Sequence, residues 1–316
     1  RRTGAVRLPT GDDITIADLK ALAIKGAVTV EEVKQGDNRL AGLKLGFEQQ
    51  GPKTNFALDG SYDEAPLTAR GDLQSAGGKT TINLQSFAAT PKKIPLQLAS
   101  PTTITIENGA VNLQQLAIGI SGGTVTLNGS AGEKLDVTAT LAGIDARLPL
   151  ENGEAHVVLD TGTASITGGM QSAVIDVQAS VGQLALPQGR IDAIKLTARS
   201  DAFNLSTQTG LIKTRIETGN TQLTSADLDR LVKGPLKVET VLDVSPQRIG
   251  FDPVTIDSSN LGGTVDGAFE IAAKTLNAGF NLSVLPAGLP TSVSPKFDTL
   301  VTLSGMVTTG ADGAVD

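Results

Sequence analysis

The chain of 316 residues contains no cysteine and a single histidine. Without cysteine it has neither a disulfide framework nor a thiolate metal site. Its formal net charge is −7, so it lacks the excess of Lys and Arg with which nucleic-acid-binding proteins neutralise phosphates. These absences argue against a disulfide-stapled domain, a zinc-finger protein and a nucleic-acid partner.

Aromatic residues are scarce, at 3% of the chain, with no Trp and one Tyr. Hydrophobic residues nevertheless make up 40%, and most of them are Leu, Ile, Val and Ala. β-Sandwich cores are usually built around rings, because one ring buries roughly 150–250 Å². The chain can bury a large surface but lacks the usual anchors of such a core. Its 36 Gly and 14 Pro are spread along the sequence, which favours many short elements joined by turns.

Long hydrophobic runs are also missing, since no stretch approaches the roughly 18 apolar residues of a membrane-spanning helix. The start, Arg1-Arg2-Thr3-Gly4, has neither Met nor the apolar stretch of a signal peptide. Residues 310–316 form a turn signal without a closing element. We therefore expect one continuous segment of a larger protein over 1–316, with a break in the sheet near 285–295, where prolines gather.

Alternation of apolar and polar residues is the strongest pattern in the sequence. In 135–141 every second residue is apolar and those between are polar. Successive side chains of a strand point to opposite faces, so each such run has one aliphatic and one polar face. Alternation places these residues on the aliphatic face: Ile104, Ile106, Val125, Leu127, Leu135, Val137, Ala139, Leu141, Ile175, Val177, Ala179, Val181, Ile212, Ile216, Leu236, Val238, Phe269, Ile271, Leu276, Ala278, Phe280, Leu282 and Val284.

Turn dipeptides stand between many of these runs. Asn-Gly and Asp-Gly favour the positive φ angles of tight hairpins, so neighbouring strands should be antiparallel. The dipeptides that predict hairpins are Asp59-Gly60, Asn108-Gly109, Asn128-Gly129, Asn152-Gly153 and Asp266-Gly267. The pattern as a whole predicts an all-β fold, a long curled antiparallel sheet that forms an elongated hydrophobic groove.

One or two short helices interrupt this pattern. The stronger candidate spans Ser225 to Lys233, with Ser225 as the N-cap, acidic residues in the first turn and Gly234-Pro235 as the stop. The weaker candidate, Ala17 to Lys25, competes with a strand because Ile14, Ile16 and Ile24 also alternate.

Groups that support catalysis are few. His156 shares a face with Asp160 by alternation and is expected to be a solvated surface residue. Gly119-Ile-Ser-Gly-Gly123 matches the nucleophile-elbow pattern, but the following residues read as strand, so a Gly-rich hairpin turn is the better interpretation. We expect neither an enzyme nor a cofactor or metal site.

An aliphatic sheet face must be covered by another sheet, by helices or by a ligand. A second sheet would give a β-sandwich or solenoid, an adhesin or structural scaffold whose core is filled by its own side chains. A ligand would make the face a groove for acyl lipids. A third possibility is a platform whose sheet edges pair with unfolded strands. Scarce rings and evenly continued alternation favour the lipid groove.

Two stretches carry a resemblance to a known family. Residues 58–73, which begin Leu-Asp-Gly-Ser-Tyr, resemble the strand-turn-strand pattern of AsmA-like proteins. The stretch from Arg190 through Asp227-Leu-Asp-Arg-Leu231 to Gly262-Gly-Thr-Val-Asp-Gly267 is similar to TamB proteins of α-proteobacteria. The family offers no catalytic motif to transfer to individual residues.

The resemblance implies a periplasmic middle segment of a protein anchored in the inner membrane by an N-terminal helix. It implies a bridge that carries phospholipids toward the outer membrane. It also implies a link to outer-membrane protein assembly with an Omp85-type, TamA-like partner, through regions outside this chain.

Overall fold

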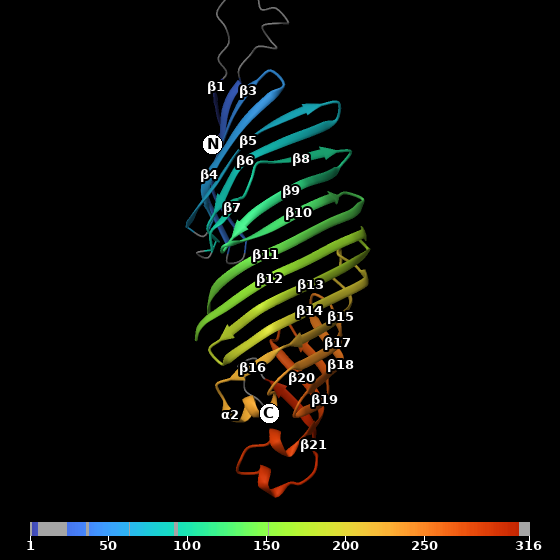
Figure 1. Ribbon diagram of the computed structural model, residues 1–316. Helices are drawn as coiled ribbons and strands as arrows, with labels where there is room; N and C mark the ends of the chain where they lie inside the picture. Colours follow the sequence, from blue (N-terminus) through green and yellow to red (C-terminus); the bar gives the residue numbers. More distant parts are fainter. Residues whose placement is uncertain are drawn as a thin grey trace, which may run out of the picture. The chain divides into compact units, whose positions relative to one another are not determined.

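The computed structural model describes residues 2–5, 24–35, 38–62, 64–91, 94–150 and 152–309 (Figure 1). The chain divides into two compact units, residues 1–133 and 134–316. Both consist almost entirely of antiparallel β-strands, which confirms the predicted all-β class. The predicted continuous segment therefore comprises two units.

The first unit forms an antiparallel sheet in which consecutive strands pair, with β7 and β8 both placed between β6 and β9. Its strands are β1 (Arg2–Ala5), β2 (Ile24–Gln35), β3 (Asn38–Gln50), β4 (Lys53–Tyr62), β5 (Ala65–Ala76), β6 (Lys79–Ala89), β7 (Leu96–Leu98), β8 (Thr102–Glu107), β9 (Ala110–Ile120) and β10 (Gly123–Ala131).

In the second unit neighbouring strands also pair antiparallel, and β15 and β16 both pair with β14. Its strands are β11 (Lys134–Leu150), β12 (Gly153–Gly169), β13 (Ser172–Leu186), β14 (Gly189–Phe203), β15 (Gly210–Thr218), β16 (Asn220–Leu223), β17 (Leu236–Val244), β18 (Arg248–Ser258), β19 (Leu261–Glu270), β20 (Thr275–Val284) and β21 (Val301–Thr309). The helices are α2 (Ala226–Leu231) and the 3₁₀ turns η2 (Pro286–Gly288) and η3 (Ser294–Lys296).

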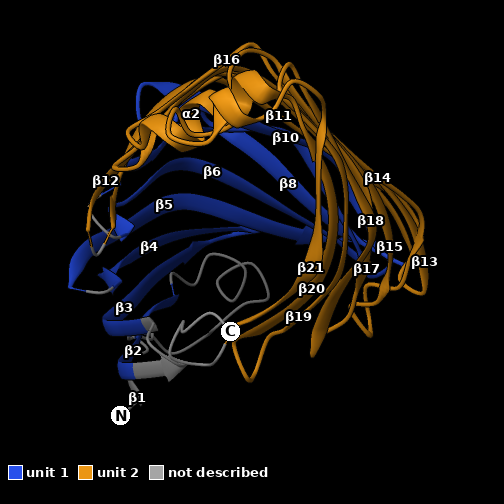
Figure 2. Ribbon diagram, turned by 90° about the horizontal axis from the view of Figure 1, so that it is seen from below, with its two compact units in different colours: residues 1–133 blue, residues 134–316 orange. Residues whose placement is uncertain are grey.

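Each sheet is curled, because its strands bend across their length (Figure 2). In the second unit the pairing of strands β11 to β14 is interrupted at one residue on each strand. These residues are Gly143, Asp160, Gly182 and Ala193, and they lie next to one another across the sheet. Gly143 and Ala193 have φ values of 63° and 53°. Bulges of this kind bend a strand and increase its twist. This line, which we call the corner, folds the long strands over.

The turn signals were only partly correct. Asn108-Gly109 forms a tight turn with both φ angles positive, and the turn between β11 and β12 contains Asn152. By contrast, Asp59-Gly60 lies inside β4, Asn128-Gly129 at a bulge inside β10, and Asp266-Gly267 inside β19. In β4 a Cβ added to Gly60 would lie 2.7 Å from the Leu43 side chain. Glycine there permits close packing between strands and makes no turn.

The stronger helix prediction is confirmed. In α2 the Ser225 hydroxyl accepts a hydrogen bond from the Leu228 N–H, and Asp227 and Asp229 occupy the first turn. An uncapped N–H at this helix end would otherwise need water, so the cap fixes where the helix begins. Of the weaker candidate, residues 17–23 lie outside the described residues, while Ile24 and Lys25 begin β2.

The Pro-rich segment 285–300 leaves the sheet and contains η2 and η3. The strands on either side of it, β20 and β21, nevertheless pair with each other from Val284↔Val301 onwards. The segment is therefore an excursion from a hairpin, and the ladder resumes directly beyond it.

Candidate functional site: an uncovered aliphatic face

One aliphatic row crosses the whole second unit. It starts on β11 and passes from strand to directly paired strand, on one side of the sheet. Its members are Leu141, Gly162, Ala179, Leu196, Ile216, Val238, Ile256, Gly263, Leu282 and Leu303. Directly opposed side chains of an antiparallel pair lie about 4.5–5.5 Å apart, so the row is a continuous apolar surface.

The row has parallel neighbours on the same face. The predicted residues Val137, Ala139, Ile175, Val177, Ile212, Leu276, Ala278 and Phe280 all lie on the same side of it, toward the ends where β11, β13, β15 and β20 begin. The structure thus places most of the predicted second-unit residues on one common face. Ile271 is an exception: it lies in the turn after β19, is 39% exposed and belongs to no row. The strand ends one residue before it, which alternation cannot detect.

Beyond the corner the aliphatic face continues with residues that alternation missed. There the apolar spacing changes from two residues to three, from Leu141 to Ile144 and from Val181 to Leu184. The direct pairs Ile144↔Leu159 and Leu159↔Val181 place the apolar residues beyond the interruption on the same face as Val181. The residues gained in this way include Ile144, Ala146, Val157, Leu159, Leu184 and Ile191. A three-residue step across a glycine is the signal on β11 and β13, whereas on β12 and β14 the step crosses Asp160 and Ala193 and no glycine marks it.

The first unit carries a similar face. Val28, Leu45, Leu58, Ala69 and Phe87 form one row across β2 to β6. The predicted residue Ile104 stands between Ile82 and Leu113, Ile106 opposite Val111, Val125 opposite Ile118 and Leu127 opposite Leu116. In this unit too the predicted residues share a face.

Neither face is sealed within the described parts of the chain. Most of the aliphatic residues are half-buried; Ile106 is 36% exposed, whereas Ala278 and Val284 are 7% and 2% exposed. Along β15, residues of the aliphatic face are half-buried and the alternate residues Leu211, Lys213 and Arg215 are exposed. Side chains crowd together on the inside of a curved sheet, so we assign the aliphatic face to the concave side seen in Figure 2.

One end of the face in the second unit has a cover. Leu261, Val284 and Leu289 form a buried cluster, and Leu231 and Val232 at the end of α2 pack against it. The Arg230 guanidinium donates to the Leu289 carbonyl at 3.3 Å, and the Asn260 side chain donates to the Arg230 carbonyl at 2.8 Å. This cap, formed by α2 and 285–289, packs over the ends of β18 to β21.

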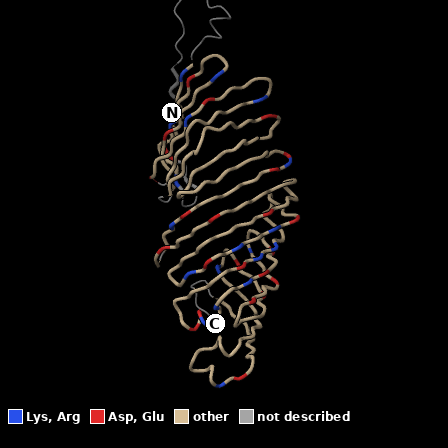
Figure 3. The backbone as a smooth tube through the Cα atoms, in the orientation of Figure 1, with Lys and Arg blue, Asp and Glu red and all other residues tan. Residues whose placement is uncertain are grey.

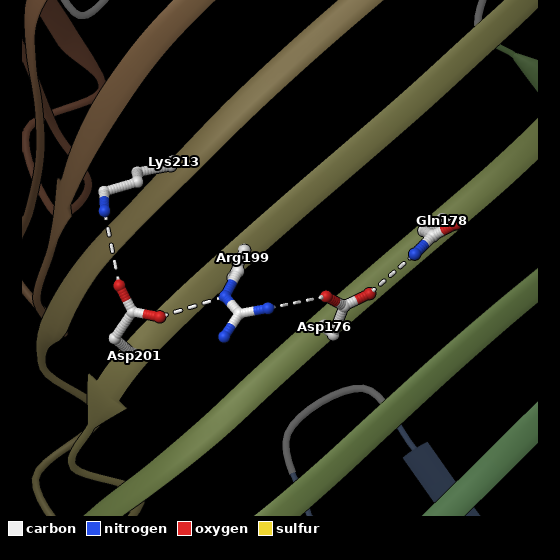
Figure 4. A network of polar contacts seen from close by, with 5 residues as sticks. All are labelled: Asp176, Gln178, Arg199, Asp201 and Lys213. Atoms are coloured by element: carbon white, nitrogen blue, oxygen red, sulfur yellow. Dashed lines mark hydrogen bonds and ion pairs between the residues drawn. The ribbon is translucent and has the colours of Figure 1, made fainter.

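Lys and Arg are interspersed with Asp and Glu along the strands (Figure 3). On β13 to β15 they form the network of Figure 4: Asp201 accepts from Arg199 at 2.9 Å and from Lys213 at 3.2 Å, and Asp176 lies 3.6 Å from Arg199. The hydrogen bond from Arg199 lowers the pKa of Asp201, and the same bond raises the pKa of Arg199. These groups are solvated, so the network makes the face opposite the aliphatic one hydrophilic and contributes little to the free energy of unfolding.

A different carboxylate, Asp72 on the polar face of β5, is buried, with 3% of its side chain exposed. It accepts from Asn83 at 2.9 Å and from Gln85 at 3.3 Å, and Lys53 lies 3.1 Å away. The hydrogen bond from Asn83 is the main cause that lowers the pKa of Asp72. Hydrogen bonds to a charged group are stronger than neutral ones, so Asp72 ties β4, β5 and β6 together.

Asp72→Ala should therefore destabilise the first unit by about 2 kcal/mol, because Asn83 and Gln85 lose a charged acceptor. The folded-state pKa lies below the unfolded value of about 3.9, so this stabilisation is present above that pH and is lost as pH falls through the folded pKa. Urea unfolding at neutral and acidic pH measures both effects. Asp59→Ala, which removes an exposed carboxylate paired with Arg70, is the control and should change little. Equal losses in the two variants would contradict the assignment.

The residues considered for catalysis are Ser121, which lies in a hairpin turn, and His156, which lies in β12. Ser121-Gly122 is the two-residue turn between β9 and β10, with φ values of 45° and 79°, so the hairpin interpretation of 119–123 is confirmed. His156 is less solvated than predicted: its side chain is 22% exposed and its Nε2 lies 2.7 Å from Asp145 Oδ1 on β11. It does not share a regular row with Asp160, because the corner interrupts the alternation there.

Across the described residues there is no group of three or more His, Asp or Glu side chains arranged to hold a metal ion. The helices in the same residues are all too short or too polar to span a membrane. No family model, no curated protein and no solved structure matches the chain.

Proposed function

We propose that the concave aliphatic face binds lipid acyl chains and shields them from water. The observation that carries this proposal is the row from Leu141 to Leu303, which is continuous across the second unit yet only half-buried. An acyl chain laid on such a face gains roughly 0.8 kcal/mol for each buried methylene. The lining is aliphatic and repetitive, so it favours movement along the face over capture at one point.

The alternative is a sandwich or solenoid scaffold that fills its own core. Such a core would bury the aliphatic side chains almost completely. In the described residues the buried hydrophobic side chains are few and mostly Ala; the exceptions are Phe203 and the cluster of Leu261, Val284 and Leu289 at the cap. Because the aliphatic rows are half exposed on a curved sheet, a bound ligand is favoured as the group that covers them.

The chemistry of the face favours an acyl chain over a polypeptide strand. A polypeptide brings an N–H and a C=O with every residue, and each costs free energy if it is buried without a partner. Along the row from Leu141 to Leu303 every side chain is aliphatic or hydrogen, so it offers no such partner. An acyl chain needs none.

The resemblance to TamB and AsmA-like proteins extends the proposal to the cell. The segment would lie in the periplasm as part of a protein anchored in the inner membrane. There it would carry phospholipids between inner and outer membrane and contribute to outer-membrane protein assembly. An Omp85-type, TamA-like partner would bind regions outside this chain.

Mass spectrometry of an organic extract tests the proposal directly. The purified chain should carry phospholipid that remains through washing and that a fluorescent fatty-acid probe displaces. A β-rich protein without an open aliphatic face, purified from the same cells, controls for lipid carried over from membranes. A lipid-free chain that also fails to bind the probe would overturn the proposal.

A further inference from the structure

A second hollow lies in the first unit, on the polar face. It is a cleft of about 620 Å³ at the place where β8 begins and where β6, β9 and β10 become irregular. Carboxamides and hydroxyls line it, among them Gln85, Gln114, Gln115, Asn128 and Ser100. Leu84 and Leu113, which belong to the aliphatic face, also border the cleft, but most of its lining is polar, so it differs in chemistry from the lipid-binding surface.

The irregularities are bulges that present polar side chains. Gln85 is the extra residue opposite the Arg70–Gly71 step. Gln115 has a φ of 54°, in the left-handed region that residues other than glycine rarely adopt. The Asn128 side-chain oxygen accepts from the Gln115 N–H at 2.8 Å and holds this conformation in place.

At the corner of the second unit small residues occupy the left-handed positions, Gly143 with a φ of 63° and Ala193 with a φ of 53°. The first unit places a long polar side chain, that of Gln115, at such a position. Bulges and strained backbone conformations are common at functional sites, which directs attention to the side chains that the strain presents.

Several of these side chains have unused hydrogen-bonding capacity. Asn83 and Gln85 already donate to Asp72, and Asn128 uses its oxygen for the Gln115 N–H. In the described structure the side chains of Gln114, Gln115 and Ser100 form no hydrogen bond with the protein. A carboxamide offers two N–H donors and an acceptor oxygen, and a hydroxyl offers both functions. The cleft therefore presents mixed donors and acceptors.

We propose that this cleft binds an uncharged, polyhydroxylated ligand, a short glycan. Each sugar hydroxyl can donate to a carboxamide oxygen while it accepts from an amide N–H. An anion is a poorer fit, because the nearest cation, Lys53, is engaged with Asp72. A peptide is a poorer fit as well, because β6, β8 and β9 each have a paired strand on both sides, and β10, which pairs only with β9 in the described structure, contributes only Asn128 to the lining.

Titration of the isotope-labelled full chain, followed by amide NMR, tests the inference. The probes are chitotetraose and maltotetraose, with the neutral peptide N-acetyl-Gly-Ser-Gly-Ser-amide as the comparison. At least one sugar should cause saturable shifts at the amides of Gln85, Gln114 and Asn128. Gln114→Ala combined with Gln115→Gly should weaken this binding about tenfold or more, since each lost hydrogen bond contributes a factor of roughly five.

The variant and its control separate binding from misfolding. Glycine at position 115 suits the positive φ, so the sheet should remain intact and its other amide signals unchanged. Gln178→Ala removes the same functional group from the polar face of the second unit and should leave sugar binding as it was. The inference is overturned if neither sugar binds, if the double variant binds equally well, or if the peptide saturates the cleft and the sugars do not.

Discussion

Leu196→Asp should reduce binding of acyl chains to the second unit by about 100-fold, equivalent to about 3 kcal/mol. Leu196 stands in the middle of the aliphatic row, between Ala179 on β13 and Ile216 on β15. The change removes apolar contact with the ligand and places a carboxylate where a bound chain would strip its water. Displacement of a fluorescent fatty-acid probe, together with the phospholipid content of the purified variant, measures the effect.

The adjacent residue supplies a matched control. Thr197 points to the polar face, is exposed and pairs with Arg215 on β15. Thr197→Asp introduces the same charge one residue away, on the other side of the same strand, and should bind the probe like the unmodified chain. Because Leu196 is only half-buried, both variants are expected to fold, which circular dichroism verifies. If the two variants bound lipid equally well, the aliphatic face would not be the binding surface.

The sequence predicts this aliphatic face only where apolar residues recur at every second position. Alternation by two correctly identified the rows of β13, β15, β17 and β20. In these segments the ladder is either uninterrupted or has its bulge outside the predicted residues. The pattern failed beyond the corner, where one inserted residue reverses the phase. Alternation continued from Leu141 and Val181 would place Ile144 and Leu184 on the polar face, although they continue the aliphatic one.

Other features had no signal in the sequence. The unused carboxamides of Gln114 and Gln115 look like ordinary surface residues until the ladder shows Asn128 opposite them. Asp72 reads as one more polar residue of an alternating strand, and only the paired strands bring Asn83 and Lys53 to its carboxylate. Contacts between residues distant in sequence depend on register, which local pattern does not define.

Glycine was the most misleading residue, because it serves two physical purposes in this fold. At Asn108-Gly109 it provides the positive φ of a tight turn. At Gly267 it provides room: the residue lies inside β19, directly opposite Ala278 of β20. A Cβ at position 267 would lie 2.1 Å from the Asn277 carbonyl oxygen and 2.8 Å from the Ala278 Cα. Such distances are far shorter than a van der Waals contact, so β19 and β20 approach each other closely only without a side chain there.

Gly267→Ala should consequently destabilise the second unit by about 3 kcal/mol. The clash is with backbone atoms of the neighbouring strand, which cannot move aside as a flexible side chain would. Relief requires the β19–β20 ladder to open on the concave side, where the aliphatic rows of both strands meet. Guanidinium denaturation followed by circular dichroism gives the loss in unfolding free energy.

Gly169→Ala in β12 is the control that distinguishes this clash from a general intolerance of alanine for glycine in strands. A Cβ added at Gly169 meets no heavy atom within 4 Å. Its replacement should change the unfolding free energy by less than about 0.5 kcal/mol. Since Gly267 lies on the aliphatic face, an opened ladder should also reduce lipid binding in proportion to the unfolded fraction, whereas Leu196→Asp reduces it in a folded chain. Similar stabilities for the two glycine variants would show that the approach of β19 to β20 is looser than the 2.1 Å contact requires.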